Sequence, residues 1–271
     1  MYVLLRHFVW YGGEKIIEKE SSLLKRENER IDQMIQFDRQ IIQSDDTFAL
    51  STDTLFLAYF ARVRRRPKQK IVDFCSGNGA LPLLLSSWTA APIFGVEIQE
   101  DLADMSRRSV QLNGLGEQIQ IITANIRVIE NYFQRESMDL ITCNPPYFKV
   151  YPDSWINPND KKALARHELT MTLEDIFAKA FYLLKDRGRL CVVHRPERLT
   201  ELIVNGSKYH LVPKRIRLVY PKPNKSSNMV LIDFIKNGKE KGLDILSPLY
   251  VYQEDGSYSL EVQGYLDGTC R

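Results

Sequence analysis

The chain has 271 residues, of which 44% are hydrophobic and 26% are charged, and its formal net charge at pH 7 is +3. A chain of this length and composition can bury the core of one α/β domain, which excludes a disordered or fibrous protein. The slight excess of basic residues permits a nucleic-acid partner but does not demand one.

The cysteines and the apolar opening bear on metal, membrane and compartment. The four cysteines lack the paired spacing of metal ligands, and three lie in or at the end of apolar strand-like runs. They are Cys75, Cys143, Cys191 and Cys270. Such cysteines are typical of small buried side chains in a reducing compartment. The apolar residues 1–13 are too short to span a bilayer and lack a cleavage site. We therefore expect a cytoplasmic protein with no metal and no membrane partner; the sequence carries no signal for an oligomeric state.

Three regions follow one another along the chain. Residues 1–29 are an extension to which the sequence assigns no role. Residues 30–69 are predicted to form a small hairpin and one helix. Residues 70–271 are predicted to form the main domain, in which strand-like and helix-like stretches alternate.

The region 30–69 carries hairpin and helix signals. Two short strands are predicted at Ile31–Phe37 and Arg39–Gln43, joined by a tight turn. Ser51 can cap the helix that follows. The apolar residues of this helix recur at helical spacing and are Leu55, Phe56, Tyr59, Phe60 and Val63.

The alternation from Lys70 onward predicts a doubly wound parallel sheet. The expected strands are 70–75, 92–97, 119–123, 138–143 and 188–194. The expected helices are 81–88, 101–113 and one that starts with a capping box of Thr172 and Asp175.

The end of the chain departs from a purely parallel sheet. After a short helix at 197–204, the strands 214–220 and 228–236 are separated only by PKPNKSS. This loop is too short for a helical crossover, so the two strands are expected to pair antiparallel. A mostly parallel seven-stranded sheet with a C-terminal antiparallel hairpin resembles the class I methyltransferases, with a Rossmann-like α/β fold.

The first chemical motif is DFCSGNG, residues 73–79. A glycine-rich turn between the first strand and its helix lets a ligand approach the backbone closely. Glu97 ends the second strand, 97 − 77 = 20 positions after Gly77, where a carboxylate can accept both ribose hydroxyls. Together they predict an adenosine cofactor. No GKS or GKT follows, and a three-glycine dinucleotide fingerprint is absent.

The second motif, NPPY at Asn144–Tyr147, directly follows the fourth strand. Proline has a fixed backbone angle and restricts the preceding residue, so this stretch is held extended. Ligands in open α/β sheets bind at the carboxyl ends of the strands, so the motif is expected to lie beside residues 73–79.

These motifs carry a resemblance to a known family. The motif (N/D)PP(Y/F/W) after the fourth strand is that of amino-group methyltransferases. The stretches ERIDQMIQFDRQIIQSDDTFALSTDTLFLA, DFCSGNG, CNPPYF, ARHE and SPLYVYQEDGSYS resemble the tRNA (adenine-N6) methyltransferases that modify position 37 of valine tRNA. The resemblance covers nearly the whole chain from Arg30. It implies S-adenosyl-L-methionine as cofactor and a nucleic acid, most specifically tRNA, as partner.

The resemblance also implies the roles of the NPPY residues. The Asn144 side-chain oxygen and the Pro145 carbonyl would each accept one N–H of the target amine, so that its lone pair points at the methyl group. Tyr147 would offer a face on which the target base stacks. The implied catalytic residues are Asn144, Pro145, Pro146 and Tyr147.

The implied cofactor site extends over four strand ends. Its residues are Asp73, Cys75, Ser76, Gly77, Asn78, Gly79, Glu97, Ile98, Asn125, Ile126 and Asn144. The family carries an acidic residue where this chain has Asn125, which can still accept from an adenine amino group. Ser51 and Asp53 either border the methionine end of the cofactor or simply cap a helix.

The implied substrate contacts combine aromatic and basic residues. They are Tyr147, Phe148, Arg166, His167, Arg195, Arg198, Lys222 and Lys225. Two basic clusters, residues 62–70 and 214–225, are consistent with either an RNA contact or a solvated surface.

Three alternatives to adenine methylation in RNA stay open at this point. Glutamine N5 methylation of a translation factor uses the same motif, because an amide nitrogen has a similarly delocalised lone pair. Guanine-N2 methylation of ribosomal RNA or adenine methylation of DNA is a second. A non-catalytic RNA-binding protein with this fold is the third.

Overall fold

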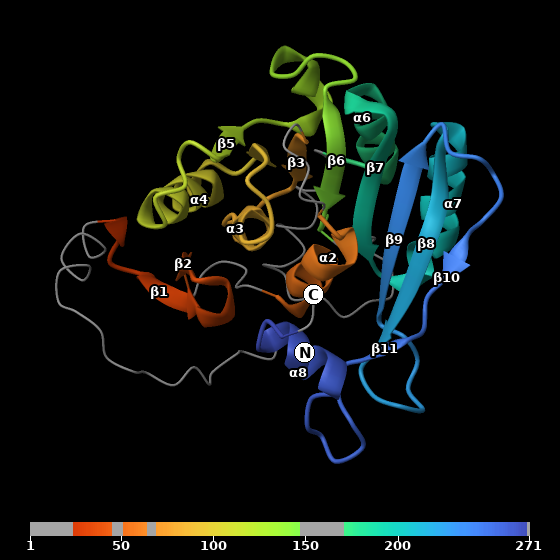
Figure 1. The fold of residues 1–271 in the computed structure, drawn as a ribbon. Helices are drawn as coiled ribbons and strands as arrows, with labels where there is room; N and C mark the ends of the chain where they lie inside the picture. Colours follow the sequence, from red (N-terminus) through yellow and green to blue (C-terminus); the bar gives the residue numbers. More distant parts are fainter. Residues whose placement is uncertain (1–23, 45–50, 64–68, 147–170, 270–271) are drawn as a thin grey trace, which may run out of the picture.

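The computed structural model describes residues 24–44, 51–63, 69–146 and 171–269. Its centre is a twisted sheet with helices on both faces, and a hairpin that forms its own two-stranded sheet packs at one side (Figure 1). The strands are β1 (Glu29–Met34), β2 (Arg39–Ser44), β3 (Ile71–Phe74), β4 (Ile93–Glu97), β5 (Ile119–Thr123), β6 (Met138–Cys143), β7 (Leu184–His194), β8 (Leu211–Tyr220), β9 (Met229–Lys236), β10 (Asp244–Ile245) and β11 (Leu249–Tyr250). The α-helices are α2 (Thr52–Ala61), α3 (Ala80–Ser86), α4 (Glu100–Leu112), α6 (Leu173–Leu183), α7 (Leu199–Lys208) and α8 (Leu260–Leu266). Short 3-10 helices are η1 (Ile35–Phe37), η2 (Ile126–Asn131) and η3 (Pro196–Arg198).

The strand order confirms the predicted architecture. The large sheet runs β10-β8-β9-β7-β6-β3-β4-β5, and β3 to β7 are parallel to one another. β9 is antiparallel to both β7 and β8, which is the expected C-terminal hairpin. Two strands of two residues each, β10 and β11, pair with β8 and extend the predicted seven strands to nine. Strands this short carry no periodicity that a sequence could reveal.

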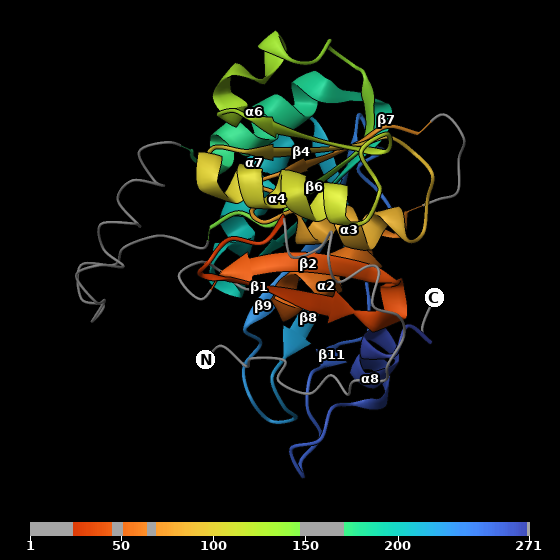
Figure 2. The ribbon, with the colours of Figure 1, turned by 90° about the vertical axis from the view of Figure 1, so that its left-hand side faces the viewer.

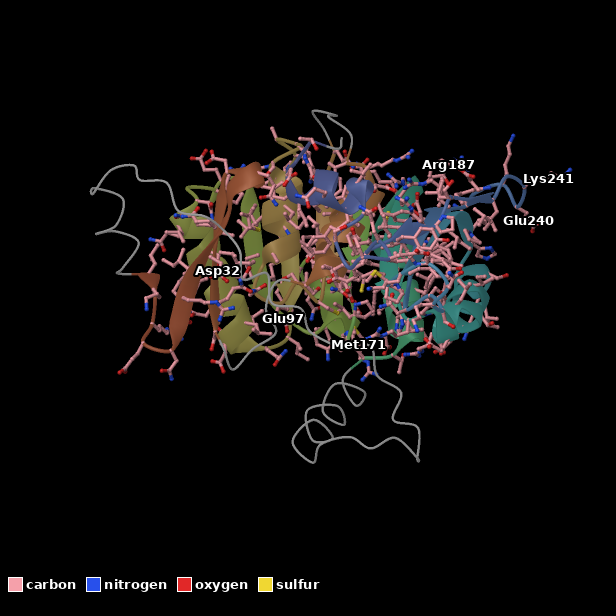
Figure 3. The ribbon with its side chains drawn as sticks, turned by 90° about the horizontal axis from the view of Figure 1, so that it is seen from below. Asp32, Glu97, Met171, Arg187, Glu240 and Lys241 are labelled. Carbon is pink, nitrogen blue, oxygen red and sulfur yellow. The ribbon has the colours of Figure 1, made fainter. Side chains whose placement is uncertain are left out.

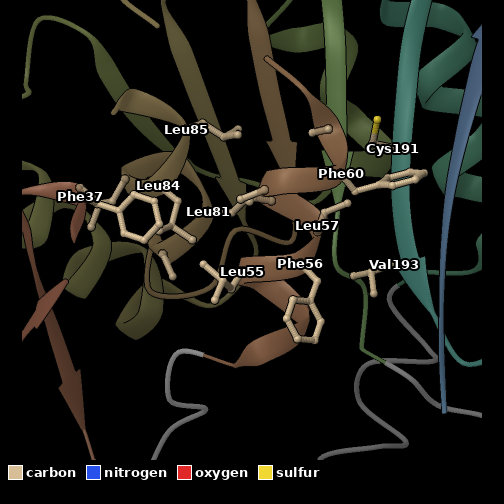
Figure 4. Packing of buried hydrophobic residues seen from close by; sticks show 14 of the residues in the cluster. Phe37, Leu55, Phe56, Leu57, Phe60, Leu81, Leu84, Leu85, Cys191 and Val193 are labelled. Atoms are coloured by element: carbon tan, nitrogen blue, oxygen red, sulfur yellow. The ribbon is translucent and has the colours of Figure 1, made fainter. Parts of the chain in front are cut away.

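The strands β3, β4, β6, β7, β8 and β9 each contribute to two apolar layers, because successive side chains point to opposite faces of the sheet. The layer that contains Cys191 and Val193 of β7 is covered by α2, α3, α4 and α8, and Figure 4 shows part of this packing. The layer that contains Leu190 and Val192 is covered by α6, α7 and η2. Cys143 and Cys191 are buried, as predicted for small core side chains.

The N-terminal hairpin is attached to α4 and shares the core of the main domain. The Ile42 N–H donates to Ser109 Oγ at 3.0 Å, and the Gln40 N–H donates to Asn113 Oδ1 at 2.8 Å. The Arg108 guanidinium donates to both oxygens of Glu29, each at 2.6 Å. Figure 2 shows β2 lying along α3 and α4, with β1 on the far side of β2. The hairpin and the main domain are thus one packing unit.

The basic residues of β8 have structural partners. The Arg215 guanidinium donates to Asp233 Oδ2 and to the Phe60 carbonyl oxygen, both at 2.9 Å, and so fastens α2 to the sheet. Arg217 donates to both oxygens of Glu261, at 2.6 and 2.7 Å, and so fastens α8. These two arginines of the cluster 214–225 are half-buried, and each holds a helix to the sheet.

Candidate active site

The glycine turn is shaped by three residues in the left-handed region. Cys75, Gly77 and Gly79 have φ values of 59°, 55° and 84°. Gly79 also precedes α3 where α4 approaches closely, because a Cβ atom there would lie 2.1 Å from Ser106 Oγ. Only glycine fits both the backbone angle and the contact. The motif thus fixes a tight turn whose backbone faces the carboxyl edge of the sheet.

Glu97 binds directly to this turn. Its Oε2 accepts the Gly77 N–H at 2.9 Å, and its Oε1 accepts the Gln99 N–H at 2.9 Å. The side chain is buried, and each oxygen retains capacity for a further hydrogen bond. Gly77 and Glu97, which lie 20 positions apart in the sequence, are therefore in direct contact. Glu97 lies near the middle of the molecule in the view of Figure 3.

Asp73 is placed behind the turn, between two strands. Its carboxyl group is 1% exposed, and its Oδ1 accepts the Thr142 hydroxyl at 2.7 Å. The pKa of Asp73 is raised to about 8. Burial is the largest cause and raises it, the Thr142 hydrogen bond lowers it, and the nearby Glu97 charge raises it. The raised pKa favours the protonated form of the Asp73 carboxyl group, and its hydrogen bond with Thr142 links β3 to β6.

The NPP residues lie beside the glycine turn, as predicted. Phe74 and Cys143 are register partners at the ends of β3 and β6, so the residues that follow both strands emerge side by side. Asn144 is half-buried, and its Nδ2 donates to Thr54 Oγ1 of α2 at 3.2 Å. Pro145 is buried and Pro146 is half-buried.

Ile98, Asn125 and Ile126 complete the edge beyond Glu97. Ile98 is 39% exposed, so its side chain presents an apolar surface next to the turn. Asn125 caps η2 by accepting the Arg127 N–H at 2.9 Å. The Ile126 side chain is buried in the apolar layer, which leaves its backbone as the part that can reach a ligand.

Ser51 has the role of a helix cap, one of its two predicted roles. Its hydroxyl accepts the Thr54 N–H at 3.3 Å at the start of α2. Asp53 lies half-buried in the same turn, within 3.4 Å of the Thr52 hydroxyl.

The predicted basic contacts differ in the hydrogen bonds and ion pairs that they already form. The exposed Arg195 donates to the Asn228 carbonyl oxygen at 3.0 Å, across the start of β9. Arg198 forms a two-point ion pair with Glu201, at 2.9 and 2.5 Å, so it would have to leave that pair to reach a phosphate. Lys222 and Lys225 lie in the turn that follows β8, at the edge of the sheet where β7 ends.

Several residues singled out in the sequence lie outside the described residues. They are Tyr147, Phe148, Arg166 and His167, together with Cys270 and the basic residues Arg64, Arg65, Arg66 and Lys68 of the cluster 62–70.

Two functional candidates were missed in the sequence. Thr54 contacts Asn144, and Thr142 contacts Asp73. Sequence analysis gave possible roles to Ser51 and Asp53, which lie beside Thr54 in STDT. The contact of Thr54 with Asn144 could not be predicted, because the two residues are 90 positions apart in the sequence. Thr142 occupies an ordinary strand position, and only the pairing of β3 with β6 reveals its partner.

Among the described residues, no group of three or more His, Cys, Asp and Glu side chains could hold a metal ion. None of the helices in the described residues is long and apolar enough to cross a membrane.

The strand order, the glycine turn after β3, Glu97 at the end of β4 and Asn144 after β6 together define the class I methyltransferase fold. A solved structure described as a predicted O-methyltransferase from Agrobacterium tumefaciens has the same fold, with a TM-score of 0.64 and 19% identity over 80% of this chain and 96% of that one.

Sequence comparisons give the family. Residues 49–206 match the methyltransferase small domain. The tRNA1(Val) (adenine(37)-N6)-methyltransferase of Tolumonas auensis is 31% identical over 68% of this chain and 74% of its own length. The protein of the same name from Porphyromonas gingivalis is 30% identical over 61% of this chain. The chain belongs to the methyltransferase small domain family and, within it, to the family of these two relatives. The match spans 65% of the length of the Porphyromonas gingivalis relative.

Proposed function

We propose that this protein transfers a methyl group from S-adenosyl-L-methionine to the N6 amino group of an adenine in RNA, at position 37 of valine tRNA. The observation that carries the proposal is the placement of Asn144 and Pro145 beside the glycine turn and Glu97. The names of the Tolumonas auensis and Porphyromonas gingivalis relatives support the choice of base, atom and tRNA.

The residues at this edge fit an adenosine cofactor. The Glu97 oxygens can accept ribose hydroxyls, and exposed Ile98 can pack against the adenine plane. The Asn78 Nδ2 is buried and has no hydrogen-bond partner in the described part of the chain, which a polar ligand group would supply. The bound cofactor would supply an electrophilic methyl group.

The chain's own residues would orient the target amine. An exocyclic amine is a poor nucleophile because its lone pair is delocalised into the ring. Asn144 Oδ1 and the Pro145 carbonyl oxygen would each accept one N–H, which favours a tetrahedral nitrogen with a directed lone pair. This chemistry requires no protein base, because the product ammonium loses its proton readily to water.

Substrate contacts are proposed along the same edge. Arg195, Lys222 and Lys225 would contact phosphates, since all three follow strands that end at this edge. The predicted stacking of the target base on Tyr147 belongs to the same proposal.

The test is transfer of labelled methyl from the cofactor to tRNA taken from cells that lack this gene, followed by digestion to nucleosides. Label in N6-methyladenosine supports the proposal, and mapping then locates the position. A parallel reaction with the protein fraction tests glutamine methylation, the alternative that uses the same motif. Label in protein alone would overturn the proposed substrate.

A further inference from the structure

We propose that Thr54 is a positioning residue that fixes which way the Asn144 amide group points. The inference rests on the proposed function, in which Asn144 Oδ1 accepts an N–H of the target. Asn144 Nδ2 donates to Thr54 Oγ1 at 3.2 Å. Thr54 is 9% exposed and lies in the first turn of α2, so its hydroxyl is held by a packed helix.

A threonine hydroxyl alone would not select one orientation of an amide. The two ends of a side-chain amide have nearly the same shape, and a hydroxyl can bind the nitrogen end as acceptor or the oxygen end as donor. Selection requires that the hydroxyl hydrogen be engaged elsewhere.

Ser51 supplies that second partner. Its Oγ lies 3.2 Å from Thr54 Oγ1 and also accepts the Thr54 backbone N–H. When the Thr54 hydroxyl donates to Ser51 Oγ, only its lone pairs face Asn144. The NH2 end of the amide is then the end that can bind. The polarity of the contact with Asn144 therefore follows from the direction of the Ser51–Thr54 hydroxyl contact, in which the proposal takes Thr54 as the donor because Ser51 Oγ already accepts the Thr54 N–H.

The consequence for the reaction is direct. With Nδ2 bound to Thr54, the other arm of the amide is Oδ1, whose two lone pairs can accept an N–H of the target amine. A reversed amide would present its own N–H groups to the N–H groups of the target, and these would repel each other. Thr54 therefore acts on the orientation of the acceptor.

The decisive variants are Thr54→Val, which keeps the shape and removes the hydroxyl, and Thr54→Ser, which keeps the hydroxyl. Thr54→Val should lower kcat roughly tenfold or more, the scale expected when an orienting hydrogen bond is removed, with little change in the cofactor Kd. Thr54→Ser should restore most of the activity. Wild-type kcat in Thr54→Val, or equal loss in Thr54→Ser, would overturn the inference.

Thr89→Val provides the matched control. Thr89 is also buried, and its hydroxyl accepts the Ala91 N–H at 3.1 Å, but it lies before β4, at the opposite edge of the sheet. The Thr89→Val variant should lower the thermal unfolding temperature about as much as Thr54→Val does, but it should leave kcat unchanged. An equal fall of kcat in both variants would assign the effect of Thr54→Val to general destabilisation, against the inference.

A second readout is independent of catalysis. The Asn144 side-chain NH2 resonance can be assigned in NMR spectra by its disappearance in Asn144→Ala. Its hydrogen exchange should be slow in the wild type and in Thr54→Ser and faster in Thr54→Val. Equal exchange in all three would overturn the inference even if the methyl acceptor were a different molecule. Failure of the tRNA assay alone would count only against the proposed function.

Discussion

The two halves of the candidate site are built differently. The cofactor half, β3 to β5, is made of segments close in sequence, and its central contact joins Gly77 to Glu97. The acceptor half joins Asn144 after β6 to Thr54 of α2. Around it, Arg215 fastens α2 and Arg217 fastens α8. A short motif can specify the first half, whereas the second depends on distant segments that the whole fold brings together.

The largest expected effect is in the acceptor half. Asn144→Ala should reduce methyl transfer by roughly 100-fold or more, since the variant lacks an aligned acceptor for the reacting amine. Cofactor binding measured by calorimetry should stay nearly unchanged, because Glu97 and the glycine turn are intact. Full activity in this variant would contradict the proposed mechanism, and loss of cofactor binding would contradict the separation of the two halves.

In the cofactor half, Gly79→Ala should be the most damaging change. The new Cβ would meet Ser106 Oγ at 2.1 Å at a φ of 84°, and the backbone strain alone is about 1–3 kcal/mol. Gly114 has a φ of 64°, but a Cβ there would meet no atom, so Gly114→Ala should show the cost of the backbone strain alone. Gly116 has neither the positive φ nor a close neighbour, so Gly116→Ala should hardly change the free energy of unfolding. Unfolding in denaturant measures all three. Equal destabilisation by Gly79→Ala and Gly114→Ala would show that the Ser106 contact is unimportant.

Glu97→Ala should weaken cofactor binding by about 1–3 kcal/mol, because the hydrogen bonds to a charged acceptor are removed. Removing the hydrogen bond to Gly77 adds to the effect by loosening the turn. Calorimetric titration with the cofactor gives the measurement. Unchanged affinity would remove Glu97 from the cofactor site.

Asp73 lies where the two halves join, and its pH behaviour tests the burial of its carboxyl group. Its pKa is raised from 3.8 to about 8 in the folded protein. The unfolded state therefore releases the proton first, and the folded wild type loses stability as pH rises from about 4 to about 8. The Asp73→Asn variant has no carboxyl group at this position and so does not lose this stability. The difference in unfolding temperature, Asp73→Asn minus wild type, should therefore increase between pH 5 and pH 8. The difference should level off above the folded pKa. Thermal scans without cofactor measure it; a difference constant with pH would show that the carboxyl group has an ordinary pKa.

The smallest effect is expected at the rim of the acceptor half. Lys222→Ala and Lys225→Ala should each raise the KM for tRNA a few-fold, and the slope of affinity against salt should fall by about one for each lysine that no longer binds a phosphate. The cofactor Kd should not change. Lys239→Ala, at an exposed lysine beyond β9, is the control. An equal salt slope in all three variants would exclude Lys222 and Lys225 as phosphate contacts.

The sequence determined the alternating strands and helices, the antiparallel ending and the two motifs at the carboxyl edge. These features follow from short-range rules: side-chain periodicity, turn residues, and a loop too short for a crossover. The contact between Gly77 and Glu97 could also be predicted from the sequence, because both residues lie in one βαβ unit, which sets their spacing.

The tertiary structure alone decided how the remaining polar groups are used. Thr142 meets Asp73 across paired strands, Thr54 meets Asn144 across 90 positions, and Arg215 turns inward to Asp233. Sequence pattern reports which face of an element is apolar, but not which distant polar groups meet once those faces are packed. Burial then sets their chemistry, because a carboxyl or amide group removed from water takes its protonation and its orientation from the few partners left to it.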